Sequence, residues 1–238
     1  LALVPLFVVL LTASPARGLL YGTAYGVLQG MLLNYWLGTY SLVSLQLVSL
    51  VTLAYHVPFL LVVLWLAKRL PRAGALVLAA GWTGFEYLRS IGFLGYPWGL
   101  WGTTQIQFPS LIQIASVTGV WGVSFVVLFL NAAVAGAIVA LGSRTPAGRI
   151  SRGLPAIVAA SVLFLGVVSF GMVSMALREA LPIRKTVRLA LVQQNDDPRK
   201  HDYDDTFGTL MRLTDEAMLQ SPDLVVWSET AFVPNIRR

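Results

Sequence analysis

Long apolar segments separated by short gaps dominate the first 177 residues of this chain. Five of them approach or exceed the roughly 20 residues that a helix needs to cross the hydrocarbon core of a bilayer, namely residues 19–37, 46–67, 73–90, 111–141 and 154–177. Residues 1–13 are equally apolar, and we interpret them as the remnant of a sixth span in a fragment truncated at both ends. With 56% hydrophobic and 12% charged residues, the chain is predicted to be an integral membrane protein.

Charged residues divide the chain into two parts. Residues 1–177 contain one acidic residue, Glu86, and eight Lys or Arg, whereas residues 178–238 contain ten acidic and nine basic residues. Lipid suits the first composition and water suits the second. We therefore predict a polytopic α-helical membrane domain of about six spans at 1–177, followed by the start of a water-exposed domain at 178–238.

The gaps between the spans alternate in charge and so predict the topology. Every second gap is basic, and the gaps at 38–45 and 91–110 hold no Lys or Arg; the basic residues are Arg17, Lys68, Arg69, Arg72, Arg144, Arg149 and Arg152. Basic connections remain in the cytoplasm. The last span is therefore expected to end on the outer face, which places the residues after Arg178 outside the cytoplasm.

Small residues form a stripe on one of the predicted spans. Gly18, Gly22, Gly26 and Gly30 recur at every fourth position and therefore share one helix face. Stripes of this kind let a neighbouring helix approach closely. We interpret this one as a packing surface.

Two charged residues lie within the segment 73–90, where lipid makes an unpaired charge costly. Glu86 and Arg89 are three residues apart and share a helix face. Either they neutralise one another near the outer interface, or they form the polar wall of a substrate cavity. His56, the lone histidine of its span, is expected to make a local hydrogen bond.

Aromatic residues and glycines crowd the gap that follows. Residues 92–105 read GFLGYPWGLWGTTQ and contain Tyr96, Trp98 and Trp101. Aromatic side chains favour the level of the lipid headgroups, and glycines oppose a regular helix. An interfacial aromatic belt and a lipid-contacting loop explain this composition equally well.

Residues 187–229 show a strand, helix, strand pattern. VRLALVQ at 187–193 and DLVVWSE at 223–229 have high β propensity, and residues 203–220 place apolar side chains at helical spacing. Glu229 is thereby predicted at the carboxyl end of the second strand, the edge of an α/β sheet where ligands and catalytic groups gather. A surface carboxylate that begins a loop is the alternative.

The residue inventory excludes several kinds of chemistry within the chain. No Cys is present, so the chain can form no disulfide, thiolate metal site or thiol nucleophile. We expect no metal and no cofactor. A net charge of +6 does not indicate a nucleic-acid partner, because the basic residues lie in membrane connections rather than in a stripe interleaved with aromatics.

Four stretches, in this order, resemble the apolipoprotein N-acyltransferase family of bacterial membrane enzymes. They are FEYLRSIGFLGYPWGLWGTTQ (85–105), PSLIQIASVTGVWGVSFVVLFLNAAVA (109–135), VRLALVQQN (187–195) and DLVVWSETAFVP (223–234). The resemblance implies a multi-pass protein of the inner membrane. It also implies that residues 178–238 begin a nitrilase-like α-β-β-α sandwich on the periplasmic side.

The resemblance further implies acyl transfer through a thioester. The acyl donor would be a phospholipid, and the acceptor the N-terminal diacylglyceryl-cysteine of an apolipoprotein. The family uses a Glu, Lys and Cys triad, in which Glu229 matches the general base. The Lys and Cys would lie outside this chain, which alone is expected to be inactive. The candidates for substrate contact are Tyr96, Trp98, Trp101, Glu86 and Arg89.

Two other functions are weighed against this one. A membrane-tethered nitrilase-like amidohydrolase would need no acyl-chain cavity between the helices and residues 92–105. A transporter or channel would use Glu86, Arg89 and His56 as an ion path, with the tail as an accessory domain.

Overall fold

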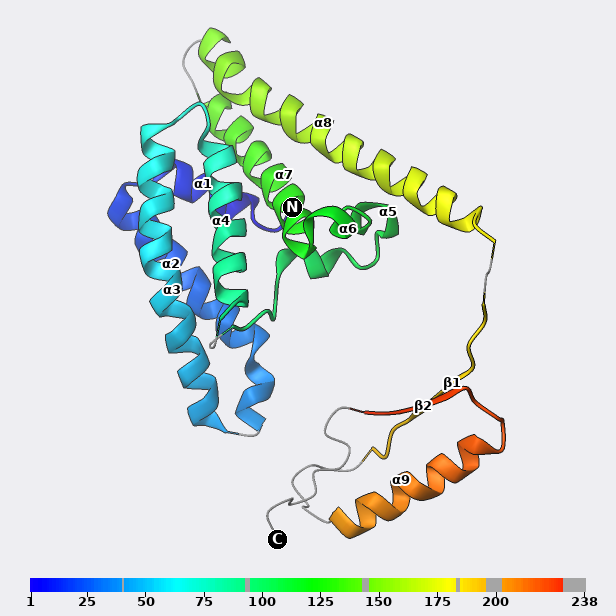
Figure 1. Cartoon of the computed structure of the whole chain (residues 1–238). Coiled ribbons are helices and arrows are strands. Elements are labelled where there is room, and N and C mark those ends of the chain that lie inside the picture. Colours follow the sequence, from blue (N-terminus) through cyan, green and yellow to red (C-terminus); the bar gives the residue numbers. More distant parts are fainter. Residues whose placement is uncertain (40, 93–94, 143–145, 183–184, 196–202, 229–238) are drawn as a thin grey trace. The chain divides into compact units, whose positions relative to one another are not determined.

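Figure 1 shows a computed structural model that describes residues 1–39, 41–92, 95–142, 146–182, 185–195 and 203–228. The chain divides into two units, Leu1–Ala180 and Leu181–Arg238. The described residues of the first unit form helices and loops, and those of the second form two strands and a helix. The last helix of the first unit, α8 (Pro146–Glu179), continues past the boundary expected after Leu177.

Helices of very different length make up the first unit. They are α1 (Val4–Thr12), α2 (Pro15–Leu33), the 3-10 helix η1 (Tyr35–Thr39), α3 (Leu42–Arg69), α4 (Gly74–Ser90), the 3-10 helix η2 (Trp101–Gln105), α5 (Pro109–Ile112), α6 (Ala115–Thr118), α7 (Val120–Leu141) and α8. Local sequence explains several boundaries. The Ser14 and Ser41 side chains cap α2 and α3, and Pro15 occupies the first turn of α2.

Three helical segments among the described residues are long and apolar enough to cross a membrane, namely α3, α7 and residues Gly153–Glu179 of α8. The expected spans at 19–37 and 73–90 correspond to α2, with 19 residues, and α4, with 17. Neither belongs to these three segments. Both pack against α3, so they are part of the same bundle.

The single span expected at 111–141 is wrong, because the structure divides it. Gly119 has a φ of +67° and separates α6 from α7. A residue in the left-handed region cannot continue a right-handed helix, and glycine adopts that region without a steric cost. The long helix is therefore the 22-residue α7, and α5 and α6 are short helical turns before it.

Helix α7 forms the centre of the first unit, where it packs against α1, α4 and α8. Its residues Ala132, Ala133 and Ala135 are fully buried. The Asn131 amide is buried too, and it uses both of its ends: Oδ1 accepts from the Leu3 backbone N–H at 3.1 Å, and Nδ2 donates to the Val127 carbonyl at 2.8 Å. A satisfied amide of this kind joins α1 to α7 without leaving a polar group unpaired in an apolar interior.

The glycine stripe of α2 packs against α3, as predicted. Gly18, Gly22 and Gly26 face Leu64, Leu60 and His56 in turn, so the two helices run antiparallel and side by side. Gly30 differs from the other three, because a Cβ added there would meet nothing within 4 Å.

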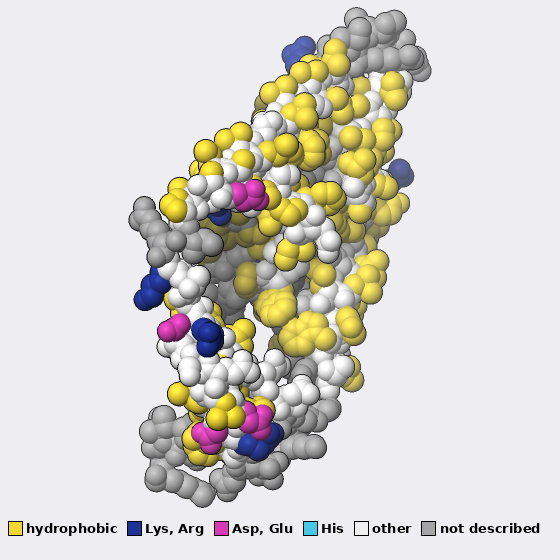
Figure 2. Space-filling model, turned by 90° about the vertical axis from the view of Figure 1, so that its right-hand side faces the viewer, with side chains coloured by type: hydrophobic (Ala, Val, Ile, Leu, Met, Phe, Trp, Pro, Cys, Tyr) yellow, Lys and Arg dark blue, Asp and Glu magenta, His cyan; other side chains and the backbone are white. Residues whose placement is uncertain are grey.

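Hydrophobic side chains cover much of the face of the molecule shown in Figure 2. Large exposed examples on α8 include Leu154, Val158, Val162 and Leu165. A contiguous apolar surface of this kind would be a liability in water, but it suits contact with lipid.

The second unit contains β1 (Leu189–Val192), α9 (Tyr203–Met218) and β2 (Leu224–Trp227). The strands are parallel, with Leu189 opposite Leu224 and Val192 opposite Trp227. Val192 and Leu210 form the buried core of the second unit. The Trp227 indole N–H donates to the Thr214 hydroxyl at 3.0 Å. The strand, helix, strand order predicted for this region is confirmed.

Substitution of Gly22 by Ala tests the packing of α2 on α3. A Cβ at Gly22 would collide with the buried Leu60 side chain. Overpacking typically costs about 1–3 kcal/mol, more than the gain of up to about 1 kcal/mol in helix propensity. We expect a lower midpoint of thermal unfolding in detergent for Gly22→Ala. Gly30→Ala is the matched control, and an equal loss in both variants would contradict this packing.

Candidate functional site

The connections between helices gather at two opposite ends of the first unit. Lys68 at the end of α3 donates through Nζ to the carbonyls of Leu11 and Ala13 after α1, at 3.1 and 2.6 Å. Lys68 also lines one cavity together with Leu11, Arg72 and Val139, which lie near the ends of α1, α3 and α7. We call this the basic end, because Lys68 and Arg72, from one of the basic gaps of the sequence, line its cavity.

The gaps without Lys or Arg meet at the other end, which we call the aromatic end. The Tyr96 hydroxyl donates to Asn34 Oδ1, and the rings of Trp36 and Trp98 lie 5.7 Å apart between centroids. Burial raises the pKa of the Tyr96 phenol, and the nearby Arg89 charge partly offsets this rise. Tyr96 is thus a neutral donor at physiological pH.

Arg89 holds the first part of the loop that connects α4 to η2. Its Nη1 donates to the Tyr96 carbonyl at 3.3 Å and its Nη2 to the Trp98 carbonyl at 2.7 Å. The Tyr96 N–H donates back to the Arg89 carbonyl at 2.6 Å. Hydrogen bonds from a charged donor are stronger than neutral ones, so these contacts set the path of residues 95–98.

Glu86 holds the far end of the same loop. Its side chain is 1% exposed, and Oε1 accepts from the Trp101 backbone N–H at 2.9 Å. The next residue, Gly102, donates its N–H to Ser124 Oγ of α7 at 2.8 Å. The loop is therefore attached to both α4 and α7, and we call residues 95–102 the clamped loop.

No ion pair joins Glu86 to Arg89, although the structure describes both side chains. The two side chains therefore do not contact each other, and each binds backbone groups of the clamped loop. Their opposite charges still attract each other through space, so the interpretation of mutual neutralisation stays open. The carboxylate oxygen Oε2 and the Arg89 Nε are buried and have no hydrogen-bond partner among the described residues.

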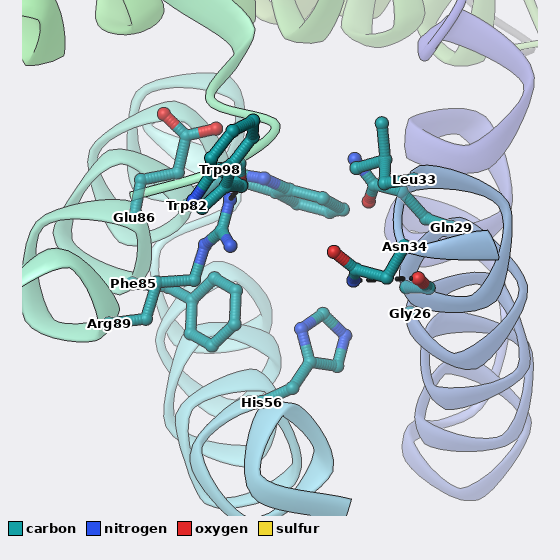
Figure 3. Close-up of a pocket in the computed structure, with 11 residues that line it drawn as sticks. Gly26, Gln29, Leu33, Asn34, His56, Trp82, Phe85, Glu86, Arg89 and Trp98 are labelled. Atoms are coloured by element: carbon teal, nitrogen blue, oxygen red, sulfur yellow. Dashed lines mark hydrogen bonds between the residues drawn. The ribbon is translucent and has the colours of Figure 1, made fainter. Parts of the chain in front are cut away.

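A small polar pocket lies between α2, α3 and α4 at the aromatic end (Figure 3). Asn34, His56, Glu86, Arg89 and Trp98 line it together with apolar residues and with Gly30 of the stripe. Its volume of about 30 Å³ has room for roughly one water molecule. Glu86 and Arg89 thus line a polar cavity, as the second interpretation expects, but the cavity is too small for a lipid substrate.

His56 makes a hydrogen bond to another helix, α2, rather than the local one expected of it. Its Nε2 lies 3.2 Å from the Gly22 carbonyl, and its ring meets the rings of Phe85 and Trp82 edge to face. In the part of the chain that the structure describes, no group of three His, Asp or Glu side chains is placed to hold a metal ion.

A larger apolar groove lies beside the polar pocket. One wall comes from α2 and the other from the clamped loop and η2, and the volume is about 300 Å³; the lining residues are Tyr25, Leu28, Gln29, Leu32, Leu33, Gly99, Trp101 and Thr104. Gly99 has a φ of +69°, and any side chain there would strike Leu33. Sequence reasoning missed the α2 wall, although Leu28 and Leu32 recur at helical spacing away from the glycine stripe.

The three predicted aromatic residues lie together but have different surroundings. Trp101 lines the apolar groove, Trp98 lines the polar pocket, and Tyr96 stacks on Trp98 with centroids 6.4 Å apart. The predicted catalytic residue Glu229 lies outside the described residues. β2 ends two residues before it at Trp227, and Ser228 Oγ lies 3.1 Å from Gln194 Oε1 at the same edge of the sheet.

Comparison with known proteins gives one consistent result. Residues 1–133 match the family described as the apolipoprotein N-acyltransferase N-terminal domain. The chain is 30% identical over 100% of its length to apolipoprotein N-acyltransferase 1 of Treponema denticola, covering 44% of that protein. It is 36% identical over 99% of its length to apolipoprotein N-acyltransferase 1 of Treponema pallidum, covering 45%. The corresponding Borreliella burgdorferi enzyme is 29% identical over 96% of the chain, with 44% of the enzyme covered. The chain thus spans less than half the length of these curated relatives.

Removal of the Glu86 carboxylate tests the attachment of the clamped loop. A hydrogen bond to a charged group contributes about 1.5–3 kcal/mol. We expect the Trp101 amide of Glu86→Ala to exchange its hydrogen roughly 10 to 100 times faster, as measured by hydrogen exchange with mass spectrometry. Glu86→Gln keeps an acceptor of the same shape and should show a smaller increase. Unchanged exchange in Glu86→Ala would mean that Glu86 does not hold the loop.

Proposed function

The chain belongs to the apolipoprotein N-acyltransferase family, and on that premise we propose that the full-length protein moves an acyl chain from a phospholipid to the N-terminal diacylglyceryl-cysteine of an apolipoprotein. The observation that carries this proposal is the apolar groove of about 300 Å³ between α2 and the clamped loop. Its lining is largely apolar, as an acyl chain requires. We propose that Trp101, with Tyr96 and Trp98 beside it, lies on the path by which the donor chain reaches the groove.

Glu86 and Arg89 were candidates for substrate contact, and we propose a less direct role for them. Their polar groups are engaged by backbone atoms of the clamped loop. They act on the donor through the position of Gly99 and Trp101, which line the groove.

The membrane arrangement in this proposal places the basic end in the cytoplasm of a bacterial cell, with the protein in the inner membrane. α2 and α4 cross the bilayer alongside α3, because each packs against it. α5 packs against α8, and the carbonyl of its residue Ser110 lies close to Gly171 of α8. α8 therefore ends at the aromatic end, and the chain leaves the bundle on the outer side.

We propose that residues 178–238 begin a nitrilase-like α-β-β-α sandwich. Two features of the second unit support this: the parallel β-α-β unit, and the uncovered outer face of its sheet. Leu189, Leu191, Leu224 and Val226 are all 40% or more exposed. A second sheet layer would bury such a face, since sheets with two apolar faces require cover on both sides.

The reaction would proceed in two balanced steps. Glu229 takes the proton from a Cys thiol, and the thiolate attacks the phospholipid ester carbonyl, so that a thioester forms and a lysophospholipid leaves with the proton. The acceptor amine then attacks the thioester, loses a proton to Glu229 and regenerates the thiol. A Lys would stabilise the oxyanion in both steps. The Cys comes from the remainder of the protein, because this chain contains no Cys. The family resemblance assigns the Lys to that remainder as well.

The two alternative functions gain no support from these observations. An amidohydrolase needs no apolar groove against the bundle. An ion path through Glu86, Arg89 and His56 is disfavoured because the loop backbone and Gly22 engage these side chains and the pocket they share holds about 30 Å³.

Glu229→Gln in the full-length protein tests the catalytic part of this proposal. A general base typically contributes a factor of 100 to 10,000, so acyl-enzyme formation should slow by that amount. The thioester can be followed by intact-protein mass spectrometry after addition of a phospholipid donor. Thermal unfolding and membrane insertion should match the wild type, because the substitution keeps the shape of the side chain. A wild-type rate of thioester formation would remove Glu229 from the catalytic role.

Leu28→Trp tests the groove. The larger side chain would displace about two methylene groups of the donor chain, worth about 1.6 kcal/mol, and so reduce kcat/KM about 15-fold for long-chain phospholipids. Short-chain donors should be affected less, because they do not reach the filled part. Leu20→Trp is the matched control, since Leu20 is an exposed residue of α2 outside the groove. Equal effects of the two substitutions would show that the groove does not hold the acyl chain.

A further inference from the structure

We propose that a second lipid site exists at the basic end, where a cavity receives the phosphate group and upper acyl chain of an anionic phospholipid. The cavity has a volume of about 210 Å³ and lies among α1, α3, α4, α7 and α8. Its lining includes Leu11, Lys68, Arg72, Ala75, Val139 and Ala156. None of these residues lines the groove or the polar pocket, so this site is separate from the proposed acyl-transfer site.

The lining has two chemical parts, as a phospholipid does. Lys68 and Arg72 supply two cations, and the remaining residues are apolar and mostly small. Ala75, Gly136, Ala140 and Ala156 come from three different helices and leave space that larger residues would fill. A cavity that combines cations with an apolar wall between transmembrane helices fits the headgroup region of an anionic lipid.

The cation at Lys68 is fixed in place but not neutralised. Its Nζ donates to the Leu11 and Ala13 carbonyls, which are neutral acceptors at the end of α1. Three donors are available to an ammonium group, so one remains for a ligand. Arg72 is exposed and makes no hydrogen bond or ion pair with the described residues.

No carboxylate of the helical unit is available to balance these charges. Glu86 is the one acidic residue in positions 1–177, and it is bound to Trp101 at the aromatic end. Glu179 is the last residue of α8, beyond Gly171, which lies beside Ser110 of α5, and it does not line this cavity. A phosphate group from the bilayer is the anion that a membrane supplies at this position.

The depth of the cavity in the membrane is the depth at which lipid phosphates lie. The Arg69 guanidinium lies over the Trp65 ring at 5.4 Å from its centroid, and Trp65 is 58% exposed. Exposed tryptophans that meet basic side chains mark the headgroup layer. Lys68 adjoins this pair on α3, so its ammonium lies at the depth where lipid phosphates occur.

The test uses the full-length protein in detergent, with bound lipids counted by native mass spectrometry. Dioleoylphosphatidylglycerol and dioleoylphosphatidylcholine are titrated separately, and we expect the anionic lipid to bind at least fivefold more tightly. Each cation near an anionic lipid contributes about 1 kcal/mol, so Arg72→Gln should weaken phosphatidylglycerol binding about fivefold. Arg17→Gln, which removes a charge at the same end but outside the cavity, should change it much less.

One further variant and one competition measurement complete the test. Ala156→Leu fills the apolar part without changing the charge, and it should also weaken binding of phosphatidylglycerol. Inorganic phosphate, added in large excess over the lipid, should not displace it. Equal binding of the two lipids, equal losses in Arg72→Gln and Arg17→Gln, or displacement by inorganic phosphate would each overturn the proposal. Acyl transfer takes no part in this measurement, so failure of the proposed activity would leave it unaffected.

Discussion

The structure depends on one constraint, which is that polar groups removed from water must find hydrogen-bond partners inside the protein. Asn131 meets this requirement with both ends of its amide, and Glu86 and Arg89 meet it with part of their polar atoms, in ways that also shape the fold. Asn131 joins α1 to α7, and Glu86 and Arg89 bind backbone groups of the clamped loop. The same contacts that satisfy these groups therefore fix the connection that forms one wall of the apolar groove.

Helix α2 packs against α3 with one face and borders the apolar groove with another. Its glycines admit Leu64, Leu60 and His56 of α3, and close packing over these turns fixes the direction of α2. Leu28 and Leu32 lie on another face, where they form a wall of the groove. The packing stripe and the groove are thus two consequences of one helix with small residues on one side and large apolar residues on another.

Much of this arrangement follows from sequence patterns. Apolar length predicted the helices at 46–67 and 73–90, charge alternation predicted which connections share an end, and β propensity predicted the strands around α9. The break at Gly119 was not predictable by length, because apolar residues lie on both sides of it and φ depends on the surrounding fold.

The partners of Glu86 and Arg89 were missed for a related reason. Helical spacing shows that two side chains share a face, but it does not show that a loop passes close enough to bind them. Glu229 remains a prediction from sequence.

Arg89 and Glu86 bind the loop through carbonyl and amide groups at positions 96, 98 and 101. Every amino acid carries that carbonyl, and every one except proline carries that amide. The path of the loop is therefore insensitive to the identity of the side chains at 98 and 101. Evolution can exchange those side chains, and with them the shape offered to a lipid, while the backbone remains in place. The bundle thus separates the part of the loop that must be kept from the part that is free to diversify.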